Sequence, residues 1–325
     1  MKTFEDINQV IKDEMANINW NKKPQGLYDP IAYVLKMGGK RIRPALTLMA
    51  CNMYSENVQN AVQSAIGLEV FHNFTLLHDD IMDRADVRRG QPTVHKKWDD
   101  NTAILSGDAM QIAAYQFIAK TPIENLKRTL DLFSQTALEI CEGQQYDVEF
   151  ENRMKVESDE YLEMIRLKTA VLLGAALQIG AWIGGATDKD AQLLYDFGIN
   201  IGLAFQLKDD LLDVYGDEAT FGKKIGGDIL CNKKTYLLIH ALEIAKGDNS
   251  KELQKWLSIS DEKLSNNKIQ SVTALFNKLG VKQICEDKMQ YFYNMAIAKL
   301  DKVSVSEHKK QELRKIAEKL MFRLD

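Results

Sequence analysis

The hydrophobic and polar positions along the chain predict helices over residues 4–18, 29–37, 44–54 and 59–83, followed by charged helices beyond residue 240. No segment of useful length alternates Val, Ile or Thr with polar residues, and prolines are few, so strands are not expected. Residues 59–83 are apolar on almost every side, which predicts a central, buried helix. The chain is therefore expected to be all-α.

The longest apolar stretch, Thr169–Ala186, is close to the lower length limit of a membrane-spanning helix. Its Gln178 and its many Gly and Ala residues favour a tightly packed helix inside the protein instead. The first fifteen residues are charged throughout, which is unlike a signal peptide. We therefore expect no membrane span.

Composition narrows the class of protein further. The 325 residues are 45% apolar and contain no linker rich in Gly, Pro or Ser, so a single domain over residues 1–325 is expected. A net charge of −4 gives no reason to expect a nucleic-acid partner. The four cysteines lack CxxC spacing, which argues against a zinc site or a disulfide framework and fits a reducing cytoplasm.

Two acidic motifs carry the clearest chemical signal. Asp79, Asp80 and Asp83 follow one apolar run, and the same spacing returns at Asp209, Asp210 and Asp213. Residues four apart lie on the same face of a helix, so each motif presents a pair of carboxylates that repel unless a cation lies between them. Oxygen ligands of this kind suit Mg²⁺, which binds one or two carboxylates and completes its shell with waters and phosphates.

A single DDxxD is equally compatible with a solvated helix face. Two features of this chain favour a metal role. Apolar residues come directly before both motifs, where unpaired charge is costly, and the motif occurs twice.

Basic residues lie near the first motif. The segment Gly38–Pro44 contains Lys40 and Arg43, which could both reach one anion, although an ordinary basic loop has the same composition. Arg88 and Arg89 follow the motif, and adjacent side chains point different ways, so two separate anions are a natural interpretation. His72 lies seven residues before Asp79 on the same stripe, either as a core histidine or as a substrate contact.

Taken in order, five segments resemble the trans-type (head-to-tail) isoprenyl diphosphate synthases. They are GGKRIRP, LLHDDIMD with RRG after it, LKTA at 167–170, FQLKDDLLD, and GKKIGGD, and they extend from Gly38 to about Tyr236. The resemblance implies an all-α isoprenoid synthase bundle around a deep central cavity, usually a homodimer. It also implies condensation of isopentenyl diphosphate with dimethylallyl, geranyl or farnesyl diphosphate.

The resemblance also assigns roles to individual residues. For Mg²⁺, of which three ions per active site are implied, the ligands are Asp79, Asp83 and Asp209, with Asp213, Asp80 and Asp210 in support. The isopentenyl diphosphate site is matched by Lys40, Arg43, His72 and Arg89. The allylic diphosphate site is matched by Arg88, Lys168, Thr169, Gln206, Lys223 and Lys233, although Lys224 and Lys234 leave the choice within each lysine pair open. The residues expected to act on the leaving diphosphate are Asp79, Asp83, Lys168, Asp209 and Lys223.

Two segments between these motifs allow simpler interpretations. The acidic run Asp147–Glu151 is expected to be a solvated helix end. The glycine-rich loop Gly216–Asp228 could close over a diphosphate and exclude water, or could be a plain loop.

Product length is predicted from the helix that carries the first motif. The chain-length positions are Phe71, Phe74 and Thr75; family analogy favours Phe74, five residues before the motif, whereas helix counting places Thr75 closer to the Asp79 face. A bulky Phe74 predicts a C15 or C20 product, with a longer polyprenyl product as the alternative. A terpene cyclase or a non-catalytic partner subunit is disfavoured, because both full acidic motifs and the basic segments are present.

Overall fold

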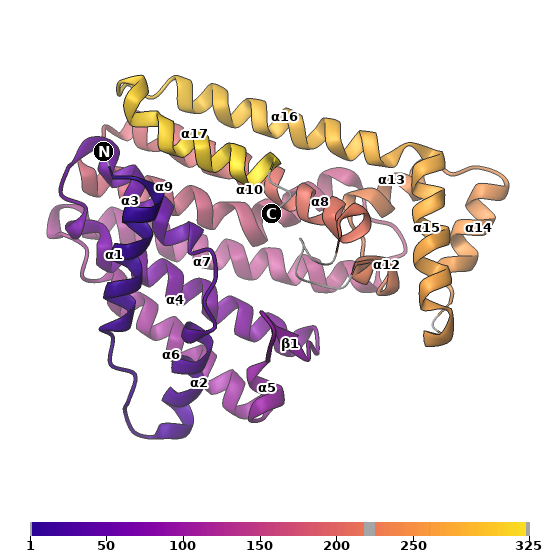
Figure 1. Ribbon diagram of the computed structural model, residues 1–325, viewed down its shortest axis with the longest axis horizontal. Helices are drawn as coiled ribbons and strands as arrows, with labels where there is room; N and C mark the ends of the chain where they lie inside the picture. The colour runs from indigo at the N-terminus through magenta and orange to yellow at the C-terminus, as the bar shows by residue number, and fades with distance from the viewer. Residues whose placement is uncertain (1, 218–224, 260, 323–325) are drawn as a thin grey trace. The chain divides into compact units, whose positions relative to one another are not determined.

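The computed structural model of the chain describes residues 2–217, 225–259 and 261–322, and most of them are helical (Figure 1). The α-helices are α1 (Phe4–Ala16), α2 (Gln25–Lys36), α3 (Ile42–Tyr54), α4 (Gln59–Met82), α5 (Val94–Lys97), α6 (Asp100–Ile118), α7 (Ile123–Asn152), α8 (Ser158–Ile165), α9 (Val171–Gly184), α10 (Asp188–Tyr215), α12 (Gly227–Leu230), α13 (Tyr236–Ile244), α14 (Asp248–Leu257), α15 (Ser265–Leu279), α16 (Val281–Asp301) and α17 (Glu307–Phe322). The predicted all-α fold is confirmed.

The chain divides into two compact units. The first comprises the residues up to Gln135, Leu172–Tyr195 and Lys302–Leu313. The second comprises Thr136–Val171, Asp196–Asp301 and the residues from Arg314 onward. The expectation of one domain over residues 1–325 stays a prediction.

In the first unit, α4 is the central helix, as its apolar sequence predicts. It packs against α3 and α6, and more lightly against α1 and α2 (Figure 1). Close approach to α6 depends on Gly67, where a Cβ atom would lie 3.0 Å from the backbone oxygen of Ala114. This packing fixes the C-terminal turn of α4, which carries the first acidic motif.

Helix α9 contains most of the apolar stretch that we expected to be buried. Its Gly180 and Gly184 lie against the backbone of α3, where added Cβ atoms would come within 2.0 Å of the Thr47 oxygen and 2.6 Å of the Cys51 oxygen. Ser158–Gly184 as a whole is long and apolar enough to cross a membrane, but 72% of its most apolar window is buried inside the protein. That burial is typical of a core helix, as predicted.

The second unit has its own hydrophobic core. Tyr161 of α8, Leu207 of α10, Leu237 of α13, Phe276 of α15 and Cys285 of α16 are buried together in it. This core supports the part of α10 that carries the second acidic motif.

Two local features were not anticipated. A π-helical turn, η1 (Arg166–Ala170), replaces α-helix between α8 and α9. The polar loop after α4 contains a short hairpin, with β1 (Val87–Arg88) paired to β2 (Gln91–Pro92). Its turn residues Arg89 and Gly90 both have positive φ, 53° and 73°, as a two-residue type I′ turn requires. The hairpin gives Arg88 and Arg89 defined directions.

A 3₁₀ turn, η2 (Glu262–Leu264), completes the elements.

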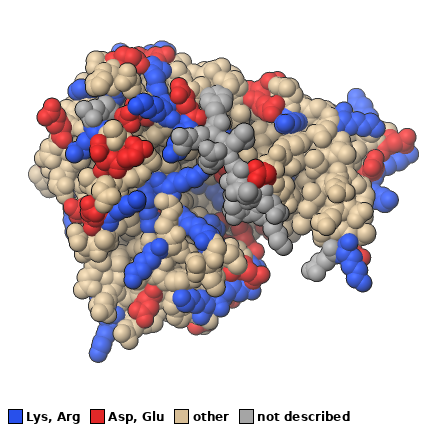
Figure 2. Space-filling view, in the orientation of Figure 1, with Lys and Arg blue, Asp and Glu red and all other residues tan. Residues whose placement is uncertain are grey.

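Acidic and basic side chains are intermingled over the face of the molecule shown in Figure 2, in keeping with the small net charge of −4. All four cysteines are free thiols, two of them buried.

Candidate functional site

The first unit gathers one set of predicted residues, which we call the first polar cluster. Its members come from the α2–α3 loop, from the first turn of α3, from α4 and its C-terminal end, and from the β1–β2 hairpin: Lys40, Arg41, Arg43, Glu69, His72, Asp79, Asp80, Asp83, Arg88 and Arg89. All of them lie within the first 135 residues, so they belong to one unit.

The three aspartates of this cluster have different surroundings. Asp79 and Asp83 are one helical turn apart. The Asp83 backbone amide donates to the Asp79 backbone oxygen at 2.9 Å where α4 ends. Asp80 is 5% exposed and accepts hydrogen bonds from Arg88, whose Nε and Nη2 both lie 2.7 Å from its Oδ1. Burial raises the pKa of Asp80 to about 6, although the Arg88 charge opposes this. Asp79 and Asp83 are therefore the more accessible pair, and Asp80 anchors Arg88.

Arg43 and His72 contact each other on neighbouring helices. Arg43 Nη1 lies 3.1 Å from His72 Nε2. A guanidinium can only donate, so Nε2 accepts and the imidazole is neutral. Burial, with the charges of Arg43 and Arg89, holds the pKa of His72 well below its usual range. Burial also lowers the pKa of Arg43 to about 10, which leaves its charge intact at neutral pH.

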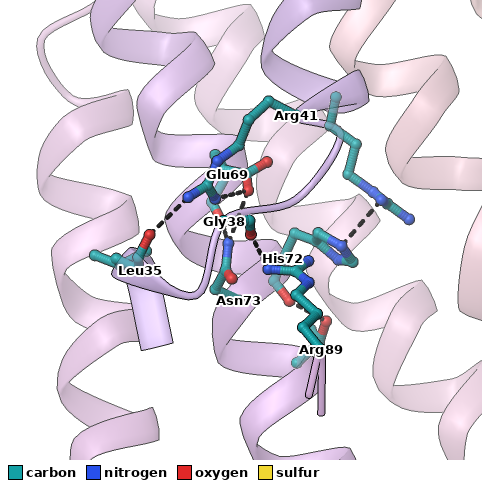
Figure 3. A network of polar contacts seen from close by, with 9 residues as sticks. Leu35, Gly38, Arg41, Glu69, His72, Asn73 and Arg89 are labelled. Carbon is teal, nitrogen blue, oxygen red and sulfur yellow. Dashed lines mark hydrogen bonds and ion pairs between the residues drawn. The ribbon is translucent and has the colours of Figure 1, made fainter. Parts of the chain in front are cut away.

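Arg89 anchors the hairpin to the α2–α3 loop. Its Nη1 donates to the Gly38 carbonyl oxygen (Figure 3). A Cβ atom on Gly39 would lie 2.8 Å from Arg89 Nη2, so the guanidinium rests directly on the glycine. Arg88 and Arg89 thus point to different partners, as adjacent residues were expected to do. Lys40, between this loop and α3, is exposed.

The second unit gathers the other predicted residues, which we call the second polar cluster: Asp147, Lys168, Thr169, Gln206, Asp209, Asp210, Asp213, Asp228 and Lys233. They come from the end of α7, from η1, from α10, and from α12 and the segment after it. The predicted residue Lys223, with its neighbour Lys224, lies outside the described residues. So does much of the loop Gly216–Asp228.

Asp210 is the buried member of the second acidic motif. It accepts hydrogen bonds from the Tyr161 hydroxyl and, at 3.4 Å, from Gln206 Nε2. Gln206 Oε1 in turn accepts from the Thr169 hydroxyl at 3.3 Å, so two predicted residues meet in one network. Burial and the nearby charge of Asp228 raise the pKa of Asp210 to about 8.

Asp209 and Asp213 lie one turn apart on α10, and Asp213 also organises the chain that follows α10. Its Oδ2 accepts from the Asp228 amide at 3.0 Å, and its backbone oxygen accepts from the Gly226 amide at 2.7 Å. The loop that was considered as a lid therefore returns to the acidic motif at its far end.

Asp147 is a candidate residue to which no role in either substrate site was assigned from the sequence. Its Oδ2 accepts a hydrogen bond from Lys168 Nζ at 2.7 Å and lies 3.8 Å from Lys233 Nζ. Burial would raise the pKa of Asp147, but the charges of Lys233 and Lys168 outweigh it and the pKa lies below the usual value. The expectation of a solvated helix end is wrong for Asp147, although Glu149 and Glu151 are exposed.

A signal for Asp147 is present in the sequence. Gly143 lies one turn earlier on α7, and a Cβ atom there would lie 2.4 Å from the backbone nitrogen of Lys168. A glycine and an aspartate four residues apart therefore mark the face of α7 that meets η1. The geometry also separates the second lysine pair, because Lys233 faces Asp147 whereas Lys234 Nζ contacts the Asn232 oxygen at 3.5 Å.

The candidate chain-length residues form part of an aromatic cluster in the first unit. Phe71 is 1% exposed, and its ring centre lies 5.4 Å from that of Phe74 and 5.1 Å from that of Phe133. Phe74 is 8% exposed and contacts His78 edge-on. Thr75 is more accessible, and its hydroxyl donates to the His72 oxygen at 2.9 Å.

Both polar clusters have a donor set that fits Mg²⁺. Each offers two carboxylates one turn apart, and a third, buried carboxylate whose pKa is raised. In the described part of the chain, no three His, Cys, Asp or Glu side chains converge on one point. Mg²⁺ does not require three, because it commonly binds one or two carboxylates together with waters and substrate phosphates.

Comparison with known proteins gives a consistent result. A sequence model described as polyprenyl synthetase matches residues 24–276. A geranylgeranyl diphosphate synthase of Methanosarcina mazei is 44% identical over 223 residues, 68% of this chain and 69% of that protein. A geranylfarnesyl diphosphate synthase of Natronomonas pharaonis is 39% identical over 73% of this chain and 74% of that protein. A solved structure of a geranylgeranyl pyrophosphate synthase has a TM-score of 0.95 and 46% identity, covering 99% of both chains.

Proposed function

The chain belongs to the polyprenyl synthetase family, and on that premise we propose that it condenses isopentenyl diphosphate with an allylic diphosphate to give a short all-trans prenyl diphosphate of C15 or C20. The allylic substrate would be dimethylallyl, geranyl or farnesyl diphosphate. The single observation that carries the proposal is the presence, in one chain, of two complete acidic motifs, with Arg88 paired to Asp80 of the first and the charge of Lys233 acting on Asp210 of the second.

In the first polar cluster, Lys40, Arg43, His72 and Arg89 are proposed to bind isopentenyl diphosphate. Arg43 supports this role, because its buried Nε has no hydrogen-bond partner among the described residues and its charge is retained. A neutral His72 can accept from Arg43 and leave the remaining guanidinium donors to an anion. These side chains would hold the isopentenyl double bond towards the allylic carbon, which removes much of the entropic cost of the reaction.

In the second polar cluster, Lys168, Thr169, Gln206 and Lys233 are proposed to bind the allylic diphosphate, together with Arg88 of the first cluster. Lys223 is proposed for the same role from the sequence alone. The shared contact of Lys168 and Lys233 with Asp147 supports the assignment, because it keeps two cations close together at modest electrostatic cost.

Asp79, Asp83, Asp209 and Asp213 are the proposed Mg²⁺ ligands, and three ions per active site are proposed by family analogy. Bound Mg²⁺ would supply Lewis-acid stabilisation to the leaving diphosphate. Lys168, Lys223 and Arg88 would spread the charge that develops on that group. The departing diphosphate is proposed to accept the proton lost from the condensed product.

Incubation of the pure protein with Mg²⁺, isopentenyl diphosphate and each allylic primer tests the proposal, with products sized after dephosphorylation. We expect elongation that stops at C15 or C20. Products of C30 or more would keep the reaction and overturn the proposed length. A cyclic hydrocarbon, or no product with any primer, would contradict the proposal and point to a cyclase or to a subunit that needs a partner.

Product length is proposed to depend on Phe74, which lies nearer the acidic motif than Phe71 and is slightly less buried. Phe74→Ala removes a large aromatic group and is expected to shift the main product upwards by at least one isoprene unit. Thr75→Ala tests the competing position, since a longer product from this variant and not from Phe74→Ala would favour Thr75 as the chain-length residue. An unchanged product distribution in Phe74→Ala would exclude Phe74 as the floor of the product site.

A homodimer is proposed from the family and from α6. Leu105 and Ile112, seven residues apart on one face, are 59% and 62% exposed, and Ile104 beside them is 43% exposed. Apolar side chains in such a row are typical of a covered surface. Light scattering should give twice the mass of the chain for the wild-type protein and a lower mass for Ile112→Lys.

Free thiols support the proposed location in a reducing cytoplasm.

A further inference from the structure

Arg41 and Glu69 form a buried ion pair within the first polar cluster. Their side chains are 10% and 3% exposed. Arg41 Nη1 donates to Glu69 Oε1, and Arg41 Nη2 donates to the Leu35 carbonyl oxygen at 2.6 Å (Figure 3). One guanidinium therefore joins the end of α2 to the middle of α4.

Glu69 is itself fixed by a second donor. Asn73 Nδ2 donates to Glu69 Oε1 at 2.9 Å and to the Glu69 backbone oxygen at 2.8 Å (Figure 3). The carboxylate thus has one position on α4. A buried ion pair adds little stability compared with a well-packed apolar pair, so its presence here calls for another explanation.

The pair lies where the backbone needs support. Gly38, Gly39 and Arg41 have φ values of 79°, 135° and 50°. A non-glycine residue in the left-handed region persists only where its surroundings hold it. The bonds of Arg41 and the bond from Arg89 to Gly38 hold this loop at both ends. Lys40 lies between the two anchored points, and Arg43 follows in the first turn of α3.

Glu69 also provides the negative charge that this part of the cluster shares. Burial lowers the pKa values of Arg43 and Arg89, and the Glu69 charge acts against that shift in both. Arg41 contacts Glu69 directly. The charge of Glu69 therefore acts on three neighbouring arginines, Arg41, Arg43 and Arg89. Glu69 itself is not among the proposed substrate ligands.

We propose that Arg41 and Glu69 are positioning residues for isopentenyl diphosphate. Their ion pair holds the loop 38–43 in the conformation in which Lys40 and Arg43 face one diphosphate group. Neither residue touches the substrate, and the inference rests on the proposed function of the cluster.

The test compares Arg41→Met, Glu69→Leu and the double variant with the wild-type protein. Each single variant leaves one buried charge unpaired, so both should lower the melting temperature and raise the KM for isopentenyl diphosphate about tenfold or more. The KM for the allylic diphosphate should stay within about twofold, since four of its proposed ligands belong to the second polar cluster and Arg88 is held by Asp80 and not by Glu69. Arg128→Met is the matched control, because Arg128 has its own carboxylate partner, Asp188, at 3.1 Å.

The double variant separates positioning from stability. An apolar pair should restore the melting temperature, while the KM for isopentenyl diphosphate stays raised. Recovery of both values together would overturn the inference and leave the pair a purely structural role. Equal increases in KM for both substrates in the single variants would overturn it as well.

Calorimetric titration with isopentenyl diphosphate keeps this inference separate from the proposed reaction. Weaker binding in Arg41→Met, in a protein whose wild type binds the ligand but makes no prenyl product, would support the inference and contradict the proposed reaction. Normal binding in Arg41→Met, in a protein whose wild type is active, would contradict the inference and leave the reaction standing.

Discussion

The two acidic motifs have the same spacing, yet their middle aspartates are held in different ways. Asp80 is paired with a charged partner, Arg88, and burial raises its pKa to about 6. Asp210 accepts from neutral donors, Tyr161 and Gln206, and its pKa rises to about 8. A repeated motif therefore does not imply a repeated environment, because burial and partners come from other parts of the chain.

The cations show the opposite arrangement. In the first polar cluster, Arg43 and Arg89 contact neutral groups, the His72 ring and the Gly38 carbonyl. In the second, Lys168 and Lys233 share the carboxylate of Asp147. The charged partners of the cations therefore differ: Asp80 and Glu69 pair with arginines in the first cluster, whereas Asp147 pairs with two lysines in the second.

The largest effects should come from the accessible aspartates, where the two clusters are expected to behave alike. Asp79→Ala or Asp209→Ala removes a proposed Mg²⁺ ligand, worth several kcal/mol of transition-state stabilisation, so turnover should fall by on the order of 10²- to 10⁴-fold. The helical circular-dichroism signal should not change. Near-normal rates in either variant would exclude that residue as a ligand.

Substituting the glycines that contact Lys168 and Arg89 should affect a different substrate in each cluster. Gly143→Ala forces a Cβ atom against the Lys168 backbone and should cost about 1–3 kcal/mol of stability while raising the allylic KM. Gly39→Ala meets only the Arg89 side chain but is strained at a φ of 135°, by about 1–3 kcal/mol, and should raise the isopentenyl diphosphate KM.

Gly26→Ala is the control for both glycine substitutions, since open space surrounds that position. Thermal unfolding and the two KM values form the readout. The assignment of substrates to clusters is wrong if each variant affects the other substrate instead.

The middle aspartates should differ in a protein freed of divalent cations. Asp80→Asn removes the nearer carboxylate of Arg88 and leaves only the more distant contact with Asp79 at 3.9 Å, so it should cost about 1–3 kcal/mol of unfolding free energy. Asp210→Asn keeps an acceptor for the Tyr161 hydroxyl, so its cost should be under about 1 kcal/mol. Denaturant unfolding in chelator measures both values, and equal costs would contradict the contrast between charged and neutral partners.

The smallest effect concerns pH and the neutral histidine of the first cluster. The folded pKa of His72 lies well below that of a free imidazole, about 6.5, so below that pH the unfolded chain binds a proton that the folded chain does not. Wild-type stability should therefore fall as the pH drops from 6.5 to 5.5, by about 1 kcal/mol more than that of His72→Gln.

Unfolding measured across this pH range tests the prediction. His308→Gln is the control, since His308 is exposed on α17. Parallel pH profiles for the wild type and His72→Gln would show that His72 is not held neutral by its surroundings.

Much of the fold could be predicted because it depends on local pattern. Apolar residues on almost every side of residues 59–83 predict a central helix, and α4 is central. The small residues in Thr169–Ala186 predict close packing, and Gly180 and Gly184 of α9 provide it against α3. The spacing of each acidic motif likewise predicts which aspartates share a face.

The remainder depends on contacts between distant segments. Asp147 looks like part of an acidic helix end until Lys168 and Lys233 are placed beside it. In the sequence, Arg41 is a third cation between Lys40 and Arg43. In the structure it forms an ion pair with Glu69, 28 residues later. Single-sequence reasoning identifies charged residues, but it does not show which carboxylate each cation meets.

The π-helical turn η1 carries a further consequence for how this chain can change. An α-helix advances about 100° per residue, and a π turn accommodates one residue more than an α turn does. Lys168 and Thr169 lie within this π turn. Deleting one residue between Arg166 and Ala170 should therefore convert the π turn into an α turn and leave a continuous helix whose two ends keep their facing directions, whereas the same deletion in a regular α-helix would rotate the ends by about 100°. In evolutionary terms, the turn is a one-residue insertion that frame-preserving deletion could reverse, at the expense of the site and not of the helix.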